Sequence, residues 1–258
     1  MAGGQVYGQY LLSMLDTYNS VTVEKQECYR QGMMRIPNFD QNNPEHQQFM
    51  QQFMHKNSFD LGVYTLGGES LLARGRNHIA QVCLTQGWDK LMFIDADAGW
   101  TWPQLRKILS SPHPLVAGIC PLKTYVAPGF DLSLNYLPFA EDEIYFDNAL
   151  RTPASTKKMA EAHKSDVVQV AFVGTAFLCI DRKVLQKMAE TTPEYMYPNP
   201  HSGQPEVHWA FFDGGPISDR YFSEDWAFCE KARALGYDIN IDTSVIISHT
   251  GNHTFRVG

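Results

Sequence analysis

Two aspartates separated by one small residue follow a short apolar run. The run is Leu91–Ile94, and Asp95, Ala96 and Asp97 come directly after it. A buried strand that ends this way places both carboxylates at the carboxyl edge of a sheet, where open α/β folds bind their ligands. Mg²⁺ and Mn²⁺ prefer oxygen ligands and commonly keep positions open for substrate phosphates. The motif therefore predicts a divalent cation site, and a solvated turn after a strand is the alternative.

Acids and a histidine near the end of the chain add to these candidates. Glu224 and Asp225 open an expected helix over residues 222–235, where capping of the first turn is the alternative role. His249 follows an expected last strand over residues 238–248, and a histidine that is satisfied in the core or on the surface is the alternative. His253 is a competing candidate for the same metal.

Basic and amide side chains gather on an expected helix over residues 71–84, which Ser70 would cap. The helix carries Arg74, Arg76 and Asn77, which suit a phosphate or a nucleotide, while His78 is expected to be structural. Lys123 and Gly174 are two further candidates: the lysine for a phosphate, and the glycine for close approach of a ligand or for a β-bulge.

These residues need a scaffold of alternating strands and helices. Apolar runs predict strands at 91–94, 115–119, 167–180 and 238–248, and helical patterns cover 71–84, 102–109, 182–189 and 222–235. We expect one α/β domain over residues 1–258, with a Rossmann-like, mixed but mostly parallel central sheet flanked by helices. Variable insertions are expected at about 19–60, 126–165 and 193–216.

The bulk composition narrows the classes of function. The 258 residues carry a formal net charge of −7, which argues against broad electrostatic binding of nucleic acid. The 5 cysteines are far apart and are expected to be reduced thiols. No apolar stretch reaches the length of a membrane span, so we expect a soluble protein of the cytoplasm.

The order and spacing of these segments resemble the GT-A glycosyltransferases, and most of all the small bacterial and phage-encoded members. The resemblance covers roughly residues 60–253. It is carried by Asp95-Ala96-Asp97, by Ser223-Glu224-Asp225-Trp226 and by His249-Thr250-Gly251, together with segments 68–77 and 173–177. One departure is that such chains usually begin with a strand, which here is either absent or replaced by Ser20–Val23.

The resemblance implies roles for the matching residues. Asp97 and His249 would bind Mn²⁺ or Mg²⁺ bridging the diphosphate of a nucleotide-sugar donor, while Asp95 would share the metal or face the ribose. Asp225 would be the general base of an inverting enzyme, with Glu224 beside it. A metal and an arginine, Arg74 or Arg76, would neutralise the leaving diphosphate.

The expected reaction is transfer of a hexose or pentose to a hydroxyl acceptor. A hydroxymethylated pyrimidine in phage DNA is one candidate acceptor, and a glycan is another. Two alternatives remain from other classes: a nucleotidyltransferase acting on sugar phosphates, and a carbohydrate-binding module without catalysis. Metal-dependent binding of a nucleotide sugar separates the enzyme from the binding module.

Overall fold

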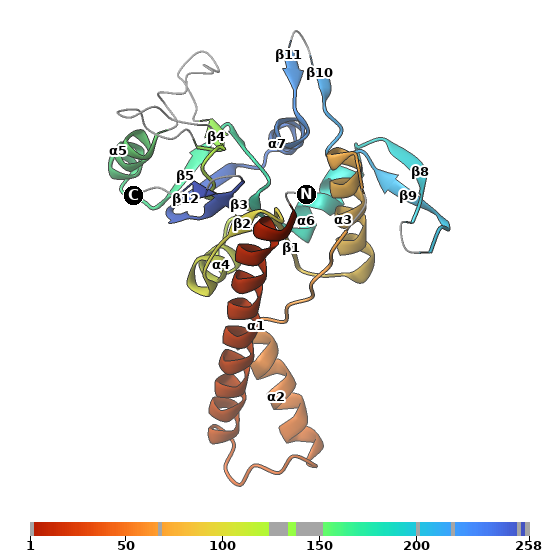
Figure 1. Ribbon diagram of the computed structural model, residues 1–258. Coiled ribbons are helices and arrows are strands. Elements are labelled where there is room, and N and C mark those ends of the chain that lie inside the picture. The colour runs from red at the N-terminus through yellow and green to blue at the C-terminus, as the bar shows by residue number, and fades with distance from the viewer. Residues whose placement is uncertain are drawn as a thin grey trace. The chain divides into compact units, whose positions relative to one another are not determined.

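Five strands form the central sheet of the computed structural model, in the order β1–β7–β3–β12–β5 (Figure 1). The structure describes residues 3–66, 69–123, 134–137, 152–199, 202–217, 220–251 and 254–255. The strands are β1 (Lys90–Ile94), β7 (Phe177–Asp181), β3 (Leu115–Ile119), β12 (Ile239–Ile246) and β5 (Val167–Val170). The middle strand, β3, is buried along its whole length, which explains its unbroken apolar sequence.

The strand directions confirm the α/β class and correct one expectation about the sheet. β7 lies between β1 and β3 and runs antiparallel to both, and β5 is antiparallel to β12. Among the described strands of this sheet, β3 and β12 are the one parallel pair of neighbours, so the expectation of a mostly parallel sheet is wrong. Apolar runs reveal that a strand is buried but not its direction, and β7 therefore looked like its neighbours.

Helices flank this sheet in the same compact unit. They are α3 (Leu72–Gln86), α4 (Trp102–Leu109), α5 (Pro153–His163), α6 (Arg182–Ala189) and α7 (Glu224–Ala234). The backbone N–H of Thr101 donates to Oε1 of Gln104 at 2.9 Å, which satisfies an N–H at the start of α4. Gly87 ends α3 with a φ of 71°, a conformation that glycine adopts without strain.

Short ladders surround the sheet and shape its edges. They are formed by β2 (Ala98–Gly99) with β13 (Ser248–Thr250) and β14 (Thr254–Phe255), β4 (Tyr136–Leu137) with β6 (Phe172–Val173), β8 (Glu194–Pro198) with β9 (Pro205–Trp209), and β10 (Gly215–Ile217) with β11 (Arg220–Phe222). Part of the expected insertion over 193–216 is thus a hairpin, β8–β9. The residues of the expected insertion at 126–165 lie mostly outside the described residues, as does His253.

Aromatic side chains join the helices to the sheet in the core. The ring of Phe212 stacks on that of Phe228 with centroids 4.5 Å apart and meets Phe93 edge to face at 5.3 Å. Phe212 and Phe228 are fully buried, and Phe93 is nearly so. Because such pairs stabilise beyond the area they bury, they fix α7 and the 211–213 segment against β1.

A separate unit is helical. Contacts divide the chain into Met1–Tyr10 with Leu66–Gly258, which holds the sheet, and Leu11–Thr65. The second unit contains most of α1 (Gly3–Met34) together with α2 (Pro44–Asn57). Ser20–Val23 lie within α1, so they do not supply a first strand. The helical unit overlaps the insertion expected at 19–60, and the single domain over 1–258 stays a prediction.

Close approach of two helices explains a glycine in this second unit. A Cβ at Gly32 would lie 2.8 Å from the side chain of Met50 and 2.9 Å from that of Phe53. Asn43 caps α2 by accepting from the N–H of Glu45 at 2.9 Å.

Among the helices that the structure describes, none combines the length and apolar character needed to cross a membrane.

Candidate functional site

The strands β1, β3 and β12 point the same way, so they deliver their following residues to one edge of the sheet. Asp95 follows β1, Cys120 follows β3, and His249 lies in β13 shortly after β12. Open α/β sheets bind ligands at this carboxyl edge.

A short ladder places His249 beside Asp97. In the pairing of β13 with β2, His249 lies opposite Ala98, and the N–H of Thr250 donates to the backbone oxygen of Asp97 at 2.8 Å. Gly99 permits this pairing, because a Cβ there would lie 2.6 Å from Oγ of Ser248. As a result Nε2 of His249 is 3.2 Å from Oδ1 of Asp97.

A hydrogen bond at the second ring nitrogen of His249 shows which nitrogen carries a hydrogen. Nδ1 lies 2.8 Å from the carbonyl oxygen of Pro121, which can only accept a hydrogen bond, so Nδ1 carries a hydrogen. Nε2 then faces the buried Oδ1 of Asp97: a charged ring donates a hydrogen bond to this oxygen, and a neutral ring turns a lone pair toward it. Two acceptors this close need a proton or a cation between them, and metal-binding histidines commonly donate their other N–H to a carbonyl in this way.

Lys123 contacts the other oxygen of the same carboxylate. Its Nζ forms an ion pair with Oδ2 of Asp97. Burial raises the pKa of Asp97, but the interactions with His249 and Lys123 outweigh burial and lower that pKa to about 2. Asp97 is therefore an anion at neutral pH, as a metal ligand has to be.

Arg76 links the first aspartate to α7. One terminal nitrogen donates to Oε1 of Glu224 at 2.7 Å and the other lies 3.8 Å from Oδ1 of Asp95. Burial raises the pKa of Asp95; Arg76 opposes this rise, while the charges of Asp97 and Asp225 add to it. The predicted acids and Arg76 are therefore close enough to act on one another electrostatically.

Arg74 contacts other groups. It forms two hydrogen bonds with Glu69, at 2.8 and 2.6 Å, and its guanidinium lies 4.4 Å from the centre of the ring of Tyr197. The structure thus brings Arg76, and not Arg74, to the acids.

Asn77 is also taken up by contacts within the protein. Its Nδ2 donates to Oδ1 of Asp213 at 2.7 Å and to the hydroxyl of Tyr195 at 3.0 Å, and its Oδ1 accepts from the N–H of Phe212 at 2.8 Å. Since the side chain is fully buried, this placement supports a structural contact and gives no support to the predicted contact with a donor.

Asp225 lies beside Gly174. A Cβ on Gly174 would come within 3.5 Å of Oδ2 of Asp225, while the hydroxyl of Ser223 donates to Oδ1 at 2.7 Å. Asp225 belongs to the first turn of α7, next to the backbone N–H groups at the helix N-terminus. One oxygen of this carboxylate is thus held by Ser223, and the other faces the position that glycine leaves open.

Asn135 is a neighbour of this site that the sequence did not single out. Its Oδ1 accepts from the N–H of Cys120 at 2.8 Å, and its Nδ2 would lie 3.1 Å from a Cβ on Gly174. That Nδ2 is buried and has no hydrogen-bond partner among the described residues. Asn135 falls in the stretch 126–165, where the absence of periodicity left no signal to identify it.

The predicted metal ligands are brought together only in part. Among the described residues, one group of three His, Cys, Asp or Glu side chains has ligand atoms within 4.8 Å of one another: His78, Glu206 and His208. Asp95 does not join Asp97 and His249 in such a group. The pair Asp97 and His249 offers two ligands, which suits an ion that takes its remaining ligands from phosphate and water.

Comparison with known proteins leaves the family open. No family model matches the chain, and no curated protein matches it. Among solved structures, A197 from STIV aligns with 16% identity and a TM-score of 0.38, covering 71% of this chain and 69% of that one. At this level of similarity, the alignment establishes neither the fold nor the function of this chain.

Proposed function

We propose that this chain is a metal-dependent glycosyltransferase that moves a sugar from a nucleoside diphosphate to a hydroxyl acceptor. The observation that carries the proposal is the facing pair of metal-ligand atoms at the sheet edge, Nε2 of His249 and Oδ1 of Asp97, 3.2 Å apart. Oδ1 of Asp97 is buried and faces Nε2 of His249, and a cation bound by both atoms would satisfy them.

In this proposal Asp97 and His249 would hold Mn²⁺ or Mg²⁺. The ion would supply positive charge that stabilises the leaving diphosphate. Lys123, which pairs with Asp97 in the structure, would be placed to contact a phosphate of the donor. Pro121 keeps the imidazole of His249 oriented throughout, through the hydrogen bond at Nδ1.

Asp95 and Arg76 serve the donor in a different way. Because Asp95 faces Arg76 and does not join the metal pair, we assign it to the ribose hydroxyls of the donor nucleotide. Arg76 offsets the repulsion among the acids and holds Glu224 in place. Glu224 is thereby a positioning residue of this site.

Asp225 is the proposed general base. An acceptor hydroxyl loses its proton as it attacks, and a carboxylate within hydrogen-bond reach accepts that proton. Oδ2 of Asp225 is the oxygen assigned to this role, since Oδ1 already accepts from Ser223. A base on the face opposite the leaving diphosphate corresponds to inversion at the anomeric carbon.

The acceptor is proposed only as a class. A glycan hydroxyl and a hydroxymethylated pyrimidine both present a primary or secondary alcohol to Asp225. The net charge of −7 gives a DNA acceptor no general electrostatic attraction, which favours the glycan.

A ligand screen tests the proposal directly. Melting temperature is measured with a panel of nucleoside diphosphate sugars, each with and without Mn²⁺, because a ligand that binds the native state raises it. The expected result is stabilisation by one nucleotide class that requires Mn²⁺ and is lost in Asp97→Asn. The active donor is then incubated with oligosaccharides or hydroxymethylated DNA to detect transfer. Stabilisation that is the same with and without Mn²⁺, or that survives Asp97→Asn, contradicts the metal site.

A further inference from the structure

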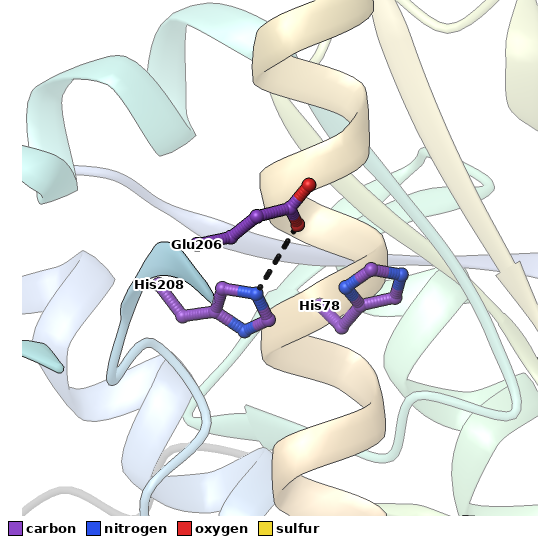
Figure 2. A group of neighbouring side chains, drawn as sticks. All are labelled: His78, Glu206 and His208. Atoms are coloured by element: carbon purple, nitrogen blue, oxygen red, sulfur yellow. Dashed lines mark ion pairs between the residues drawn. The ribbon is translucent and has the colours of Figure 1, made fainter. Parts of the chain in front are cut away.

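A second group of ligand side chains lies where the hairpin β8–β9 packs on α3. His78 comes from α3, and Glu206 and His208 come from β9 (Figure 2). One ligand atom from each lies within 4.8 Å of those of the other two. Figure 2 shows the three side chains gathered beside the helix, with a dashed line for the ion pair between Glu206 and His208.

The strongest sign of a missing ligand is His208. Its side chain is fully buried, and neither ring nitrogen has a hydrogen-bond partner among the described residues. Buried polar atoms are nearly always paired, because leaving one unpaired costs free energy. An imidazole with two buried nitrogens that lack a hydrogen-bond partner fits a residue that binds an ion or a molecule from outside the chain.

Glu206 is arranged to share that ligand. Its Oε1 accepts from Nδ2 of Asn199 at 2.8 Å, while its Oε2 lies 3.7 Å from Nε2 of His208. Alternation along β9 puts residues 206 and 208 on the same face, and that face packs against α3, which carries His78. The carboxylate is thus held by one oxygen and presents the other to the imidazole.

The protonation state of His208 also suits a metal. Burial lowers the pKa of His208, and the neighbouring carboxylate of Glu206 opposes this only in part. A lowered pKa favours the neutral ring, whose lone pair is what a metal requires. A charged histidine paired with Glu206 is the competing arrangement, and burial disfavours it.

We propose that His78, Glu206 and His208 bind one Zn²⁺ ion that joins the β8–β9 hairpin to α3. Two imidazoles and one carboxylate are a known ligand set for zinc, with water in the fourth position. Mn²⁺ and Mg²⁺ prefer oxygen ligands, so this site differs in chemistry from the pair at the sheet edge. Ligand atoms around tetrahedral zinc lie about 3.3–3.4 Å apart. The Glu206–His208 distance of 3.7 Å is close to this value, and the three ligand atoms lie within 4.8 Å of one another, so the side chains would move closer together to hold the ion.

The hairpin already contacts α3 without the ion. Asn77 donates to the hydroxyl of Tyr195, and Arg74 lies over the ring of Tyr197, both on β8. Zinc would therefore bind to a site that is largely formed and would raise the melting temperature, without being needed for folding. Because Arg76 is on the same helix, the ion also steadies the segment that reaches the acids.

Zinc titration of the full chain tests this proposal. All measurements use an Asp97→Asn background, so that the sheet-edge pair cannot contribute a zinc site. Zinc affinity is measured by competition with a chromophoric chelator, and Co²⁺ is substituted to record the visible absorption of tetrahedral coordination. Glu206→Gln is the decisive variant, because the side chain is 37% exposed and the amide keeps its size. His163→Gln, on the exposed face of α5, is the matched control.

The expected result is one Zn²⁺ per chain, an intense Co²⁺ spectrum and a higher melting temperature with zinc. Loss of a partner that merely orients a ligand commonly weakens metal binding about 10–100-fold, so Glu206→Gln should weaken zinc binding at least tenfold. His163→Gln should leave the affinity unchanged. Zinc affinity that is equal in Glu206→Gln and His163→Gln, or an octahedral Co²⁺ spectrum, overturns the proposal. Neither outcome bears on the glycosyltransferase proposal, whose test uses nucleotide sugars and Mn²⁺.

Discussion

The guanidinium of Arg76 donates to the carboxylate of Glu224 across 2.7 Å and so joins the second turn of α3 to the first turn of α7. The arginine side chain is only 7% exposed, whereas that of Glu224 is 25% exposed. Since the same guanidinium also faces Asp95 at 3.8 Å, it offsets the charges of Asp95 and Glu224, while Lys123 offsets that of Asp97.

Replacing this cation should affect both stability and donor binding. Arg76→Met removes the charge and leaves Glu224 and Asp95 without their partner, which should lower the free energy of unfolding by about 1–3 kcal/mol. Metal-dependent donor affinity should also fall, because the acids then repel one another and the incoming phosphates. Urea denaturation measures the first effect and calorimetric titration with the donor the second. The control is Arg106→Gln, an exposed arginine on α4, which should change neither quantity.

The pair formed by Asp97 and His249 predicts a selective loss of metal binding. Asp97→Asn keeps the size of the side chain but removes the anion, so Mn²⁺-dependent stabilisation by the donor and sugar transfer should both disappear. The fold should persist, because Asp97 is only partly buried and its backbone contact with Thr250 is unchanged. Isothermal titration with Mn²⁺ and donor measures the loss. Asp166→Asn, whose side chain is 64% exposed, is the control and should behave as the parent chain.

Much of the fold follows from apolar periodicity, but strand order does not. The run Leu91–Ile94 and the later run Leu115–Ile119 became β1 and β3, since both carry unbroken apolar sequence of strand length. β7 pairs between these two strands although it lies far along the chain, and no local sequence pattern predicts such a pairing. Long-range pairing of β13 with β2 also brings His249 to Asp97. From the sequence, only the family resemblance suggested that these two residues lie close together.

Sequence spacing likewise predicts part of the site, while the rest depends on how distant segments pack. Arg74 and Arg76 are two residues apart on a helix and therefore point to different sides, so spacing alone implies that only one can reach the acids. Which of them does so depends on where β1 and α7 lie. Alternation likewise puts Glu206 and His208 on one face of a strand, but their neighbour His78 is brought by the packing of the hairpin on α3.

The contacts of Asp225 predict that its replacement slows sugar transfer without weakening donor binding. Asp225→Asn should leave donor affinity within about twofold, because Asp225 lies beside Gly174 and is not part of the metal pair. The rate of transfer should fall by about 10²–10⁴, the usual contribution of a general base. Donor binding by calorimetry and transfer by chromatography are compared on the same preparation. Glu230→Gln, on the same helix and paired with Arg233, is the control. A weaker donor affinity in Asp225→Asn would contradict the prediction and make this carboxylate a donor ligand.

The ion pair at the start of α3 predicts a defined dependence of stability on pH. Hydrogen bonding from Arg74 lowers the pKa of Glu69 from 4.5 to about 2, and burial opposes this only in part. Because the pKa is lower in the folded chain than in the unfolded chain, the stabilisation is complete above about pH 5 and is lost as the pH falls toward 2.

Its size should be on the order of 1–3 kcal/mol, reduced by the partial exposure of Arg74. We therefore expect Glu69→Gln to be less stable than the parent chain at pH 7, with a difference that shrinks progressively between pH 5 and pH 2. Urea denaturation at a series of pH values measures this difference. Glu27→Gln, on an exposed turn of α1, provides the comparison for a carboxylate whose arginine partner is itself solvated, and its effect at pH 7 should be the smaller of the two. A destabilisation by Glu69→Gln that stays constant down to pH 2 would show that the loss comes from packing and not from the charge of Glu69.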